Sequence, residues 1–254
     1  MQTIVVWFSC GAASAVAAKK TVEIYGETHR VRVVNNPVAE EDSDNRRFLK
    51  DVEAWLGLPV ETATNPTYPT ASARDVWAKR KFMSGPLGAP CTVALKKEAR
   101  QEWERMNPHD FMVLGFTADE KVRHERFVKT ERDNVLPVLI NAGITKKQCF
   151  AILKDAGIAL PRVYAQGYPN ANCLGCVKAT SATYWNHVRR VNPEVFADRA
   201  AQSRALGVRL VRAKLPGKTR GERIFLDELD PSETGRPMKT MSMDCGIFCE
   251  EKPK

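Results

Sequence analysis

The sequence predicts an α/β fold, with a mostly parallel five-stranded sheet and helices on both faces, and three observations support this class. Apolar runs of strand length alternate with stretches of helical periodicity along the first part of the chain. Such alternation is typical of parallel sheets whose strands are connected by helices. The chain has 254 residues, which is enough for one sizeable core. Its hydrophobic content of 43% and charged content of 27% are ordinary for a globular protein.

The N-terminal part of the chain contains three expected strands with helices between them. The apolar run at 3–8 predicts the first strand, and residues 11–25 predict a helix that follows it directly. A second strand is expected at 29–35, where two asparagines and a proline close it. Apolar residues recur at helical spacing through 43–56 and stop at a glycine, which predicts the next helix. A short third strand is expected at 58–64.

The middle of the chain continues the alternation and completes the expected sheet. An interrupted helical region is expected at 70–106, with a break in the Gly- and Pro-rich stretch 84–91. Strands are expected at 110–116 and at 134–140, the second being the last strand of the main sheet. The Thr-x-x-Gln pattern at 145–148 is a capping box and predicts the start of a further helix.

The character of the sequence changes near residue 161. Tyrosine, glycine, asparagine and cysteine turns are followed by one expected helix near 179–206 and by a tail rich in proline and glycine. We therefore expect an α/β domain that binds a nucleotide at 1–160. Residues 161–254 are expected to form a C-terminal extension that carries a cysteine site and packs on the same core.

The charge of the chain favours an anionic partner. With 39 basic and 30 acidic residues the formal net charge is +9, which suits a nucleotide, a sulfate or a nucleic acid. A merely basic surface is the alternative, because the charges are spread along the chain. No apolar run approaches the length of a membrane span, and no basic region precedes the first apolar run as it would in a signal peptide. A cytoplasmic protein with no membrane partner is expected.

The stretch "SCGAAS" has the composition of a phosphate loop. Ser9, Gly11 and Ser14 lie between the first expected strand and the first expected helix. Small residues let backbone N–H groups approach a phosphate or sulfate, and the positive end of the helix favours an anion. The alternative is a tight turn that is filled with small residues for steric reasons.

The cysteines indicate metal or thiol chemistry. The chain has seven of them, and an odd number in an intracellular protein argues against a disulfide framework. Cys173 and Cys176 form a C-x-x-C pair, which suits one metal ion or one iron–sulfur cluster. Cys91 lies at the start of an expected helix, where a thiolate is favoured. Cys245 and Cys249 follow near the C-terminus, whereas Cys10 and Cys149 are interpreted as buried apolar residues.

The loop resembles the Ser-Gly-Gly-x-Asp-Ser loop of the ATP pyrophosphatase superfamily, the PP-loop enzymes with an adenine nucleotide alpha-hydrolase-like fold. Cys10 stands where that loop has its first glycine, and Ala13 where it has aspartate. In enzymes that adenylate their substrates this aspartate helps to hold metal and pyrophosphate, so Ala13 disfavours splitting of ATP. The loop is more similar to that of the sulfonucleotide reductases, which share the fold and split no pyrophosphate.

Further segments extend this resemblance to the phosphoadenosine phosphosulfate (PAPS) reductase family, in a divergent form like those of phages and prophages. They are "PCTVALKKEA", "VLGFTADEKVR", "VYAQGYPNANCLGC" and "DCGIF". The resemblance implies a 4Fe–4S cluster held by Cys91, Cys173 and Cys176, and a nucleophilic thiolate at Cys245 that attacks the sulfonate. It further implies that the residues in contact with the nucleotide include Ser9, Gly11, Ser14, Lys96, Lys97, Arg100, Gly115 and Arg123.

Several positions depart from the family pattern. Cys91 is single where the cluster-binding members have a pair, so Cys249 is the candidate for the missing ligand. The arginine expected beside Gly115 is absent, which leaves Arg123 or Arg126 to hold the sulfate. Zinc and free thiols remain the alternatives to the cluster at Cys173 and Cys176, and Cys245 is the alternative fourth ligand. For Lys96, Lys97 and Arg100 the alternative to nucleotide binding is that they lie on an ordinary helix face exposed to solvent.

The expected function is that of a sulfonucleotide reductase. Its substrate would be adenylyl sulfate or phosphoadenylyl sulfate, and a thioredoxin-like protein would donate the electrons. The alternatives are an ATP-dependent sulfur transferase that modifies tRNA or DNA, and a non-catalytic regulator that binds the nucleotide.

Overall fold

The computed structural model describes residues 1–85, 88–213 and 221–240. Within them the chain forms two compact units. Unit 1 comprises Met1–Pro37, Ser43–Asn65 and Ala99–Ala165. Unit 2 comprises Val38–Asp42, the described residues of 66–98 and those from Gln166 onward. Each unit is thus assembled from segments that are separated along the chain.

Unit 1 contains a five-stranded parallel sheet with the order β3-β2-β1-β4-β5. The expected class is therefore confirmed. The strands are β1 (Thr3–Trp7), β2 (Arg30–Asn35), β3 (Val60–Thr62), β4 (Phe111–Val113) and β5 (Val135–Leu136). In the register of the central pairs, Val5 lies beside Arg32 of β2 and beside Met112 of β4.

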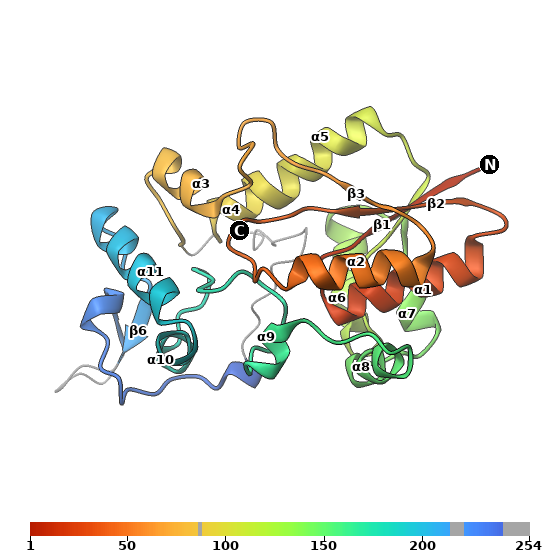
Figure 1. Cartoon of the computed structure of the whole chain (residues 1–254). Helices are drawn as coiled ribbons and strands as arrows, with labels where there is room; N and C mark the ends of the chain where they lie inside the picture. The colour runs from red at the N-terminus through yellow and green to blue at the C-terminus, as the bar shows by residue number, and fades with distance from the viewer. Residues whose placement is uncertain (86–87, 214–220, 241–254) are drawn as a thin grey trace. The chain divides into compact units, whose positions relative to one another are not determined.

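Helices cover both faces of this sheet. Figure 1 shows α5 (Ala99–Met106) on the opposite side of the sheet from α1 (Ala12–Tyr25) and α2 (Asn45–Leu56). Alternate residues of β1 point to the two faces. Ile4, Val6 and Phe8 belong to the core shared with α1 and α2, whereas Trp7 packs edge-on against Trp103 of α5 at 5.5 Å between ring centroids. Unit 1 has further helical segments in η2 (Ala118–Glu120), α6 (Lys121–Thr130), α7 (Val138–Asn141), α8 (Lys146–Asp155) and α9 (Arg162–Ala165).

The last strand of the sheet is shorter than expected. The sequence predicted a strand at 134–140, but β5 ends at Leu136 and α7 begins at Val138. Pro137 separates them, because proline has no N–H with which to continue a strand ladder. The capping box before α8 is confirmed: the Thr145 N–H donates to Gln148 Oε1 at 2.8 Å and the Gln148 N–H donates to Thr145 Oγ1 at 3.3 Å.

Unit 2 is mainly helical. The region predicted as interrupted helix forms α3 (Ala73–Arg80), and a helix resumes at Pro90. The helix predicted near 179–206 is two helices, since Pro193 starts a new one directly after Asn192. The other elements of the unit are α4 (Pro90–Thr92), the π-helical turn η1 (Val93–Glu98), α10 (Ala182–Val191), α11 (Pro193–Ala205), the antiparallel pair β6 (Val211–Ala213) and β7 (Glu222–Ile224), η3 (Leu226–Glu228) and η4 (Met238–Thr240).

No helix of the described residues is long and apolar enough to cross a membrane.

Candidate functional site

The sheet of unit 1 has its topological switch point between β1 and β4. From β1 the chain adds β2 and β3 on one side, and then adds β4 and β5 on the other. Open α/β sheets bind their ligands at the carboxyl ends of the strands where this reversal occurs. Two loops start there: the β1–α1 loop, residues 8–11, and the residues that follow β4. Four of the predicted site residues lie at this point, namely Ser9, Gly11, Ser14 and Gly115.

Ser9 in the β1–α1 loop and Ser14 in the first turn of α1 are hydrogen-bonded to each other. The Ser14 hydroxyl donates to the Gly11 carbonyl at 2.9 Å and accepts the N–H of Ser9 at 3.2 Å. The two hydroxyl oxygens lie 3.1 Å apart. Ser14 is buried with 4% of its surface exposed, whereas Ser9 is exposed. Ser14 therefore holds the loop in shape, and Ser9 is the hydroxyl that the loop presents to solvent.

Cys10 has a backbone conformation that glycine favours. Its φ is +54°, in the left-handed region that L-residues other than asparagine and aspartate rarely adopt. This is the position at which the resembling loops have glycine. The Asn35 side chain at the end of β2 supports the turn, since its Nδ2 donates to the Phe8 carbonyl at 2.7 Å and to Cys10 Sγ at 3.5 Å. The prediction omitted Asn35, although a polar residue that ends an apolar strand was the available signal.

The N-terminus of α1 opens onto a small space bordered by hydroxyl groups. Gly11, the N-cap residue, has no side chain with which to cap the helix, and the first turn contains no acidic residue. A Cβ built on Gly11 would lie 3.6 Å from Ser9 Oγ, 3.7 Å from the Tyr164 hydroxyl and 3.9 Å from Ser14 Oγ. The exposed Ser9 hydroxyl, the Tyr164 hydroxyl and the positive end of a 14-residue helix make this position suitable for a phosphate or sulfate.

Gly115 and the basic candidates of unit 1 have different surroundings. Gly115 contacts the backbone of α1 at Ala13 and Ser14. Arg123, on α6, forms an ion pair with Glu120 at 2.5 Å and stacks over Phe116. Arg100, on α5, has 1% of its side chain exposed and lies 3.9 Å from a carboxylate oxygen of Glu104. Burial lowers the pKa of Arg100 to about 10. Arg100 is therefore packed inside the unit, and the alternative that it lies on a solvated helix face is wrong.

Lys96 and Lys97 belong to unit 2, on the π-helical turn η1. Lys96 Nζ forms an ion pair with Glu41 Oε1 at 3.0 Å, and the two side chains are only 6% and 11% exposed. The solvated-face alternative is therefore wrong for Lys96 too, whereas Lys97 is partly exposed. The burial of Lys96 depends on Glu41, which lies on a distant segment of the chain, so helical periodicity did not reveal it.

The C-x-x-C pair is a turn that hydrogen bonds hold on two sides. The Leu174 N–H donates to the Glu40 carbonyl at 2.9 Å, and the Cys176 N–H donates to the Tyr184 hydroxyl at 2.8 Å. Gly175 between them is left-handed, with φ +63°. Burial, together with the nearby Cys176, raises the pKa of Tyr184 well above its usual range. Two hydrogen bonds thus support the turn, and a neutral phenol lies beside Cys176.

The described part of the chain does not bring a third predicted ligand to this turn. Cys91 lies in α4, whereas Cys245 and Cys249 fall outside the described part of the chain. Among residues 1–85, 88–213 and 221–240, no group of three His, Cys, Asp or Glu side chains is arranged to hold a metal ion. The described residues therefore contain the Cys173–Cys176 turn but no complete set of metal ligands.

Comparison with known proteins finds similarity of fold alone. The chain matches no family model and no curated protein. It is similar to the crystal structure of phosphoadenylyl-sulfate (PAPS) reductase from Candida auris in a phosphate complex. The TM-score is 0.47 and the identity 8%, over 67% of this chain and 80% of the other. It is also similar to the U34-tRNA thiolase NcsA from Methanococcus maripaludis with its 4Fe–4S cluster, with a TM-score of 0.45 and 10% identity over 81% and 69% of the two chains. At these levels neither likeness indicates which reaction this chain performs.

Proposed function

We propose that the protein binds an adenine nucleotide at the β1–α1 loop and acts on it as a sulfonucleotide reductase, with adenylyl sulfate or phosphoadenylyl sulfate as substrate. The observation that carries the proposal is the space at the N-terminus of α1, where Ser9, Ser14 and Tyr164 place hydroxyls around Gly11 at the switch point of the sheet. A helix N-terminus beside hydroxyl donors stabilises a phosphate or sulfate. The net charge of +9 favours anionic ligands in general.

The first turn of α1 favours a sulfonucleotide over ATP splitting. It contains no acidic side chain, and Ala13 occupies the position at which the resembling pyrophosphatase loops have aspartate. A carboxylate is the group that would hold a divalent metal against pyrophosphate. The loop is therefore suited to bind an anion directly, without a metal ion held by the first turn of α1.

The chemistry of the proposal uses a cysteine thiolate. The Cys245 thiolate attacks the sulfur, the sulfur–oxygen bond to the nucleotide breaks, and the nucleoside phosphate leaves with the bonding pair. The SO₃ group is then on Cys245. A thiol of a thioredoxin-like donor attacks Cys245 Sγ and releases sulfite, and the second thiol of the donor resolves the mixed disulfide. The donor thus supplies both electrons and ends as a disulfide.

The cysteine turn of unit 2 supports a metal or iron–sulfur centre in the same protein. In this proposal Cys173 and Cys176 hold a 4Fe–4S cluster together with Cys91 and Cys249, or hold zinc in its place. Anaerobic purification followed by iron, sulfide and zinc analysis decides between them. About four irons per chain supports the cluster, and one zinc without iron overturns it.

The test of the function is binding and turnover by the anaerobically purified full chain. Calorimetry with adenylyl sulfate, phosphoadenylyl sulfate and ATP measures affinity, and sulfite release in the presence of thioredoxin measures turnover. We expect sulfite release that is lost in Cys245→Ser. Cleavage of ATP to AMP and pyrophosphate that depends on tRNA or DNA would instead identify a sulfur transferase. Binding without any turnover would identify a nucleotide-dependent regulator.

A further inference from the structure

The segment between α8 and α9 brings a tyrosine to the β1–α1 loop. The N–H of Ala12, the first residue of α1, donates to the Tyr164 hydroxyl at 3.4 Å. It also lies 3.7 Å from the position that a Cβ on Gly11 would take. The ring packs edge-on against Phe150 of α8, with 5.1 Å between centroids. The hydroxyl therefore lies at the N-terminus of α1 beside Gly11, where the proposed nucleotide would place its phosphate or sulfate.

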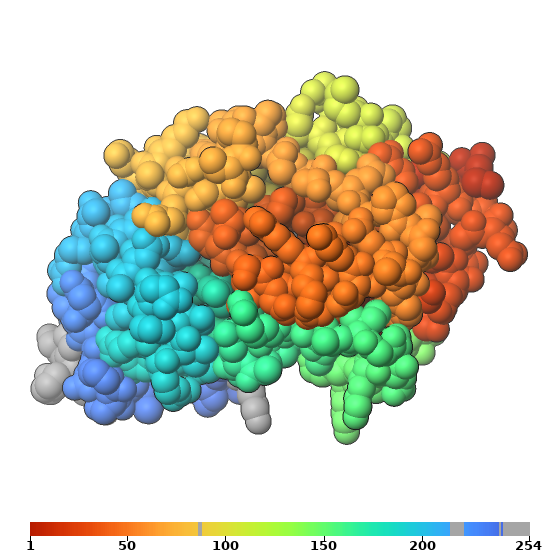
Figure 2. Space-filling view, viewed as in Figure 1, coloured from red at the N-terminus to blue at the C-terminus, as the bar shows by residue number. Residues whose placement is uncertain are grey.

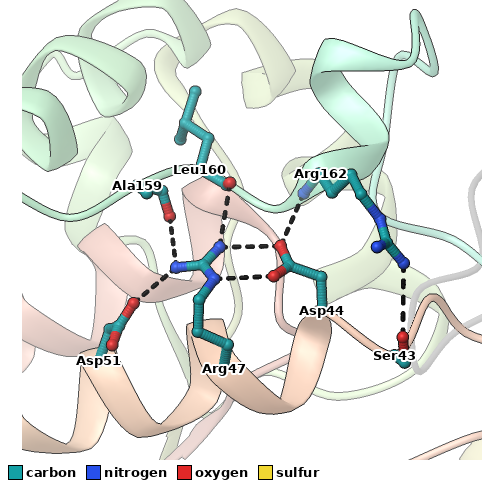
Figure 3. Close-up of polar contacts among 7 residues, drawn as sticks. All are labelled: Ser43, Asp44, Arg47, Asp51, Ala159, Leu160 and Arg162. Carbon is teal, nitrogen blue, oxygen red and sulfur yellow. Dashed lines mark hydrogen bonds and ion pairs between the residues drawn. The ribbon is translucent and has the colours of Figure 1, made fainter.

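A charged clamp, formed by Asp44 at the N-cap of α2 and Arg47 in its first turn, holds this segment. The Arg47 guanidinium donates to both oxygens of Asp44 at 2.8 Å, and to the carbonyls of Ala159 at 3.0 Å and Leu160 at 3.1 Å (Figure 3). Asp44 Oδ2 accepts the N–H of Arg162 at 2.8 Å. In the space-filling view the surfaces of α2 and of the segment after α8 meet without a gap (Figure 2). The backbone on the N-terminal side of Tyr164 is thus fixed at three points.

We propose that Tyr164 is a specificity residue of the nucleotide site, whose hydroxyl contacts the phosphate or sulfate of the bound ligand, and that the Asp44–Arg47 clamp is its positioning device. The inference rests on the proposed function and deepens it. The ligand at this position is an oxyanion, because the neighbouring groups are the α1 N-terminus and the hydroxyls of Ser9 and Ser14. A phenol hydroxyl donates well to an oxyanion, and it discriminates against ligands that lack one.

The substitution Tyr164→Phe tests the contact, because it removes one oxygen and leaves the ring on Phe150. Hydrogen bonds to charged groups are strong enough that we expect the Kd for adenylyl sulfate to rise about tenfold or more. The thermal unfolding midpoint should fall only slightly, because the Ala12 N–H loses the Tyr164 hydroxyl as its acceptor. Tyr25→Phe, at the opposite end of α1, is the matched control and should leave the Kd unchanged. An unaltered or lower Kd in Tyr164→Phe overturns the inference.

A double-mutant cycle tests whether the clamp acts through Tyr164. Asp44→Asn should raise the Kd for adenylyl sulfate in the otherwise unaltered chain, and should raise it little further when Tyr164→Phe is already present. Full additivity of the two effects would overturn the positioning role. Inorganic sulfate serves as a second probe, and its binding should weaken in the same variants.

The proposed function and this inference fail in different ways. If the unaltered chain binds none of adenylyl sulfate, phosphoadenylyl sulfate and ATP, the proposed function is overturned, and the inference with it. If it binds one of them and Tyr164→Phe binds equally well, only the inference is overturned.

Discussion

Gly115 lies against the first turn of α1 so closely that a Cβ built on it would stand 2.8 Å from the Ser14 nitrogen and 3.0 Å from Ser14 Cα. Backbone atoms cannot move aside as the end of a flexible side chain can. The glycine is therefore what allows the residues after β4 to reach the start of α1 and close the site from that side.

Gly115→Ala should destabilise the fold, whereas Gly11→Ala should affect only the ligand. At Gly115 the methyl group meets backbone, so we expect a loss of about 1–3 kcal/mol in the free energy of unfolding. At Gly11 the φ of −97° and contacts of 3.6–3.9 Å accept a methyl group, so stability should change by less than about 0.5 kcal/mol. The methyl group would nevertheless fill the space between the hydroxyls. Urea denaturation and calorimetry separate the two effects. Equal losses of stability in both variants would contradict this assignment.

Cys10→Gly should be more stable than Cys10→Ala. At most buried positions the order is the reverse, but the left-handed φ of +54° at Cys10 costs an L-residue about 1 kcal/mol that glycine avoids. Cys149, buried inside α8, is the matched control. There the glycine variant should be about 1 kcal/mol less stable than the alanine variant. Urea unfolding of the four variants measures both differences, and the same order at both positions would contradict the prediction.

The stabilisation that Asp44 provides should be lost in acid. Hydrogen bonds from Arg47 are the main reason that the pKa of Asp44 is lowered from 3.8 to about 2. The folded chain therefore binds this proton more weakly than the unfolded chain does. The stabilisation is complete above about pH 5 and is lost as the pH falls toward 2, and it amounts to about 1–2 kcal/mol for this partly exposed side chain.

The difference in unfolding free energy between the unaltered chain and Asp44→Asn measures this contribution. It should be largest at neutral pH and should shrink between pH 5 and pH 2. A difference that stays constant over this range would show that the charge of Asp44 adds nothing to the clamp.

Lys96 and Glu41 should be energetically coupled. Breaking a buried ion pair from one side leaves an uncompensated charge, so Lys96→Met should cost about 3 kcal/mol. The double variant Lys96→Met with Glu41→Gln should cost clearly less than the sum of the single variants, by at least about 1 kcal/mol. Lys97→Met, on the partly exposed neighbour, is the control and should cost less than about 0.5 kcal/mol. Additive losses in the double variant would contradict the coupling.

Much of the fold was predictable because its signals are local. The strand-length apolar runs, the glycine after α2 and the capping box of Thr145 and Gln148 act on residues a few positions away. The errors have local physical causes as well. Pro137 ended a strand whose apolar pattern continued, and Pro193 divided a region whose helical pattern was continuous. In both cases the missing N–H of proline outweighed periodicity.

The candidate site was predictable only in part. Ser9, Gly11 and Ser14 are neighbours in the sequence, so their composition indicated a phosphate loop directly. Tyr164 and Asn35 reach the same loop from other parts of the chain, and no local pattern links them to it. The buried state of Lys96 likewise depends on Glu41, a partner on a distant segment.

The amino-acid sequence by itself determined the order of strands and helices, the small-residue loop without an acid at position 13, and the spacing of the cysteines. Each of these depends on bonded neighbours or on the chemistry of single residues. Only the tertiary structure decided which hydroxyls surround Gly11, which glycine is required by a close approach and which basic residues are packed inside. Those properties arise from contacts between segments far apart in the chain, where packing and desolvation act on whichever groups the fold brings together.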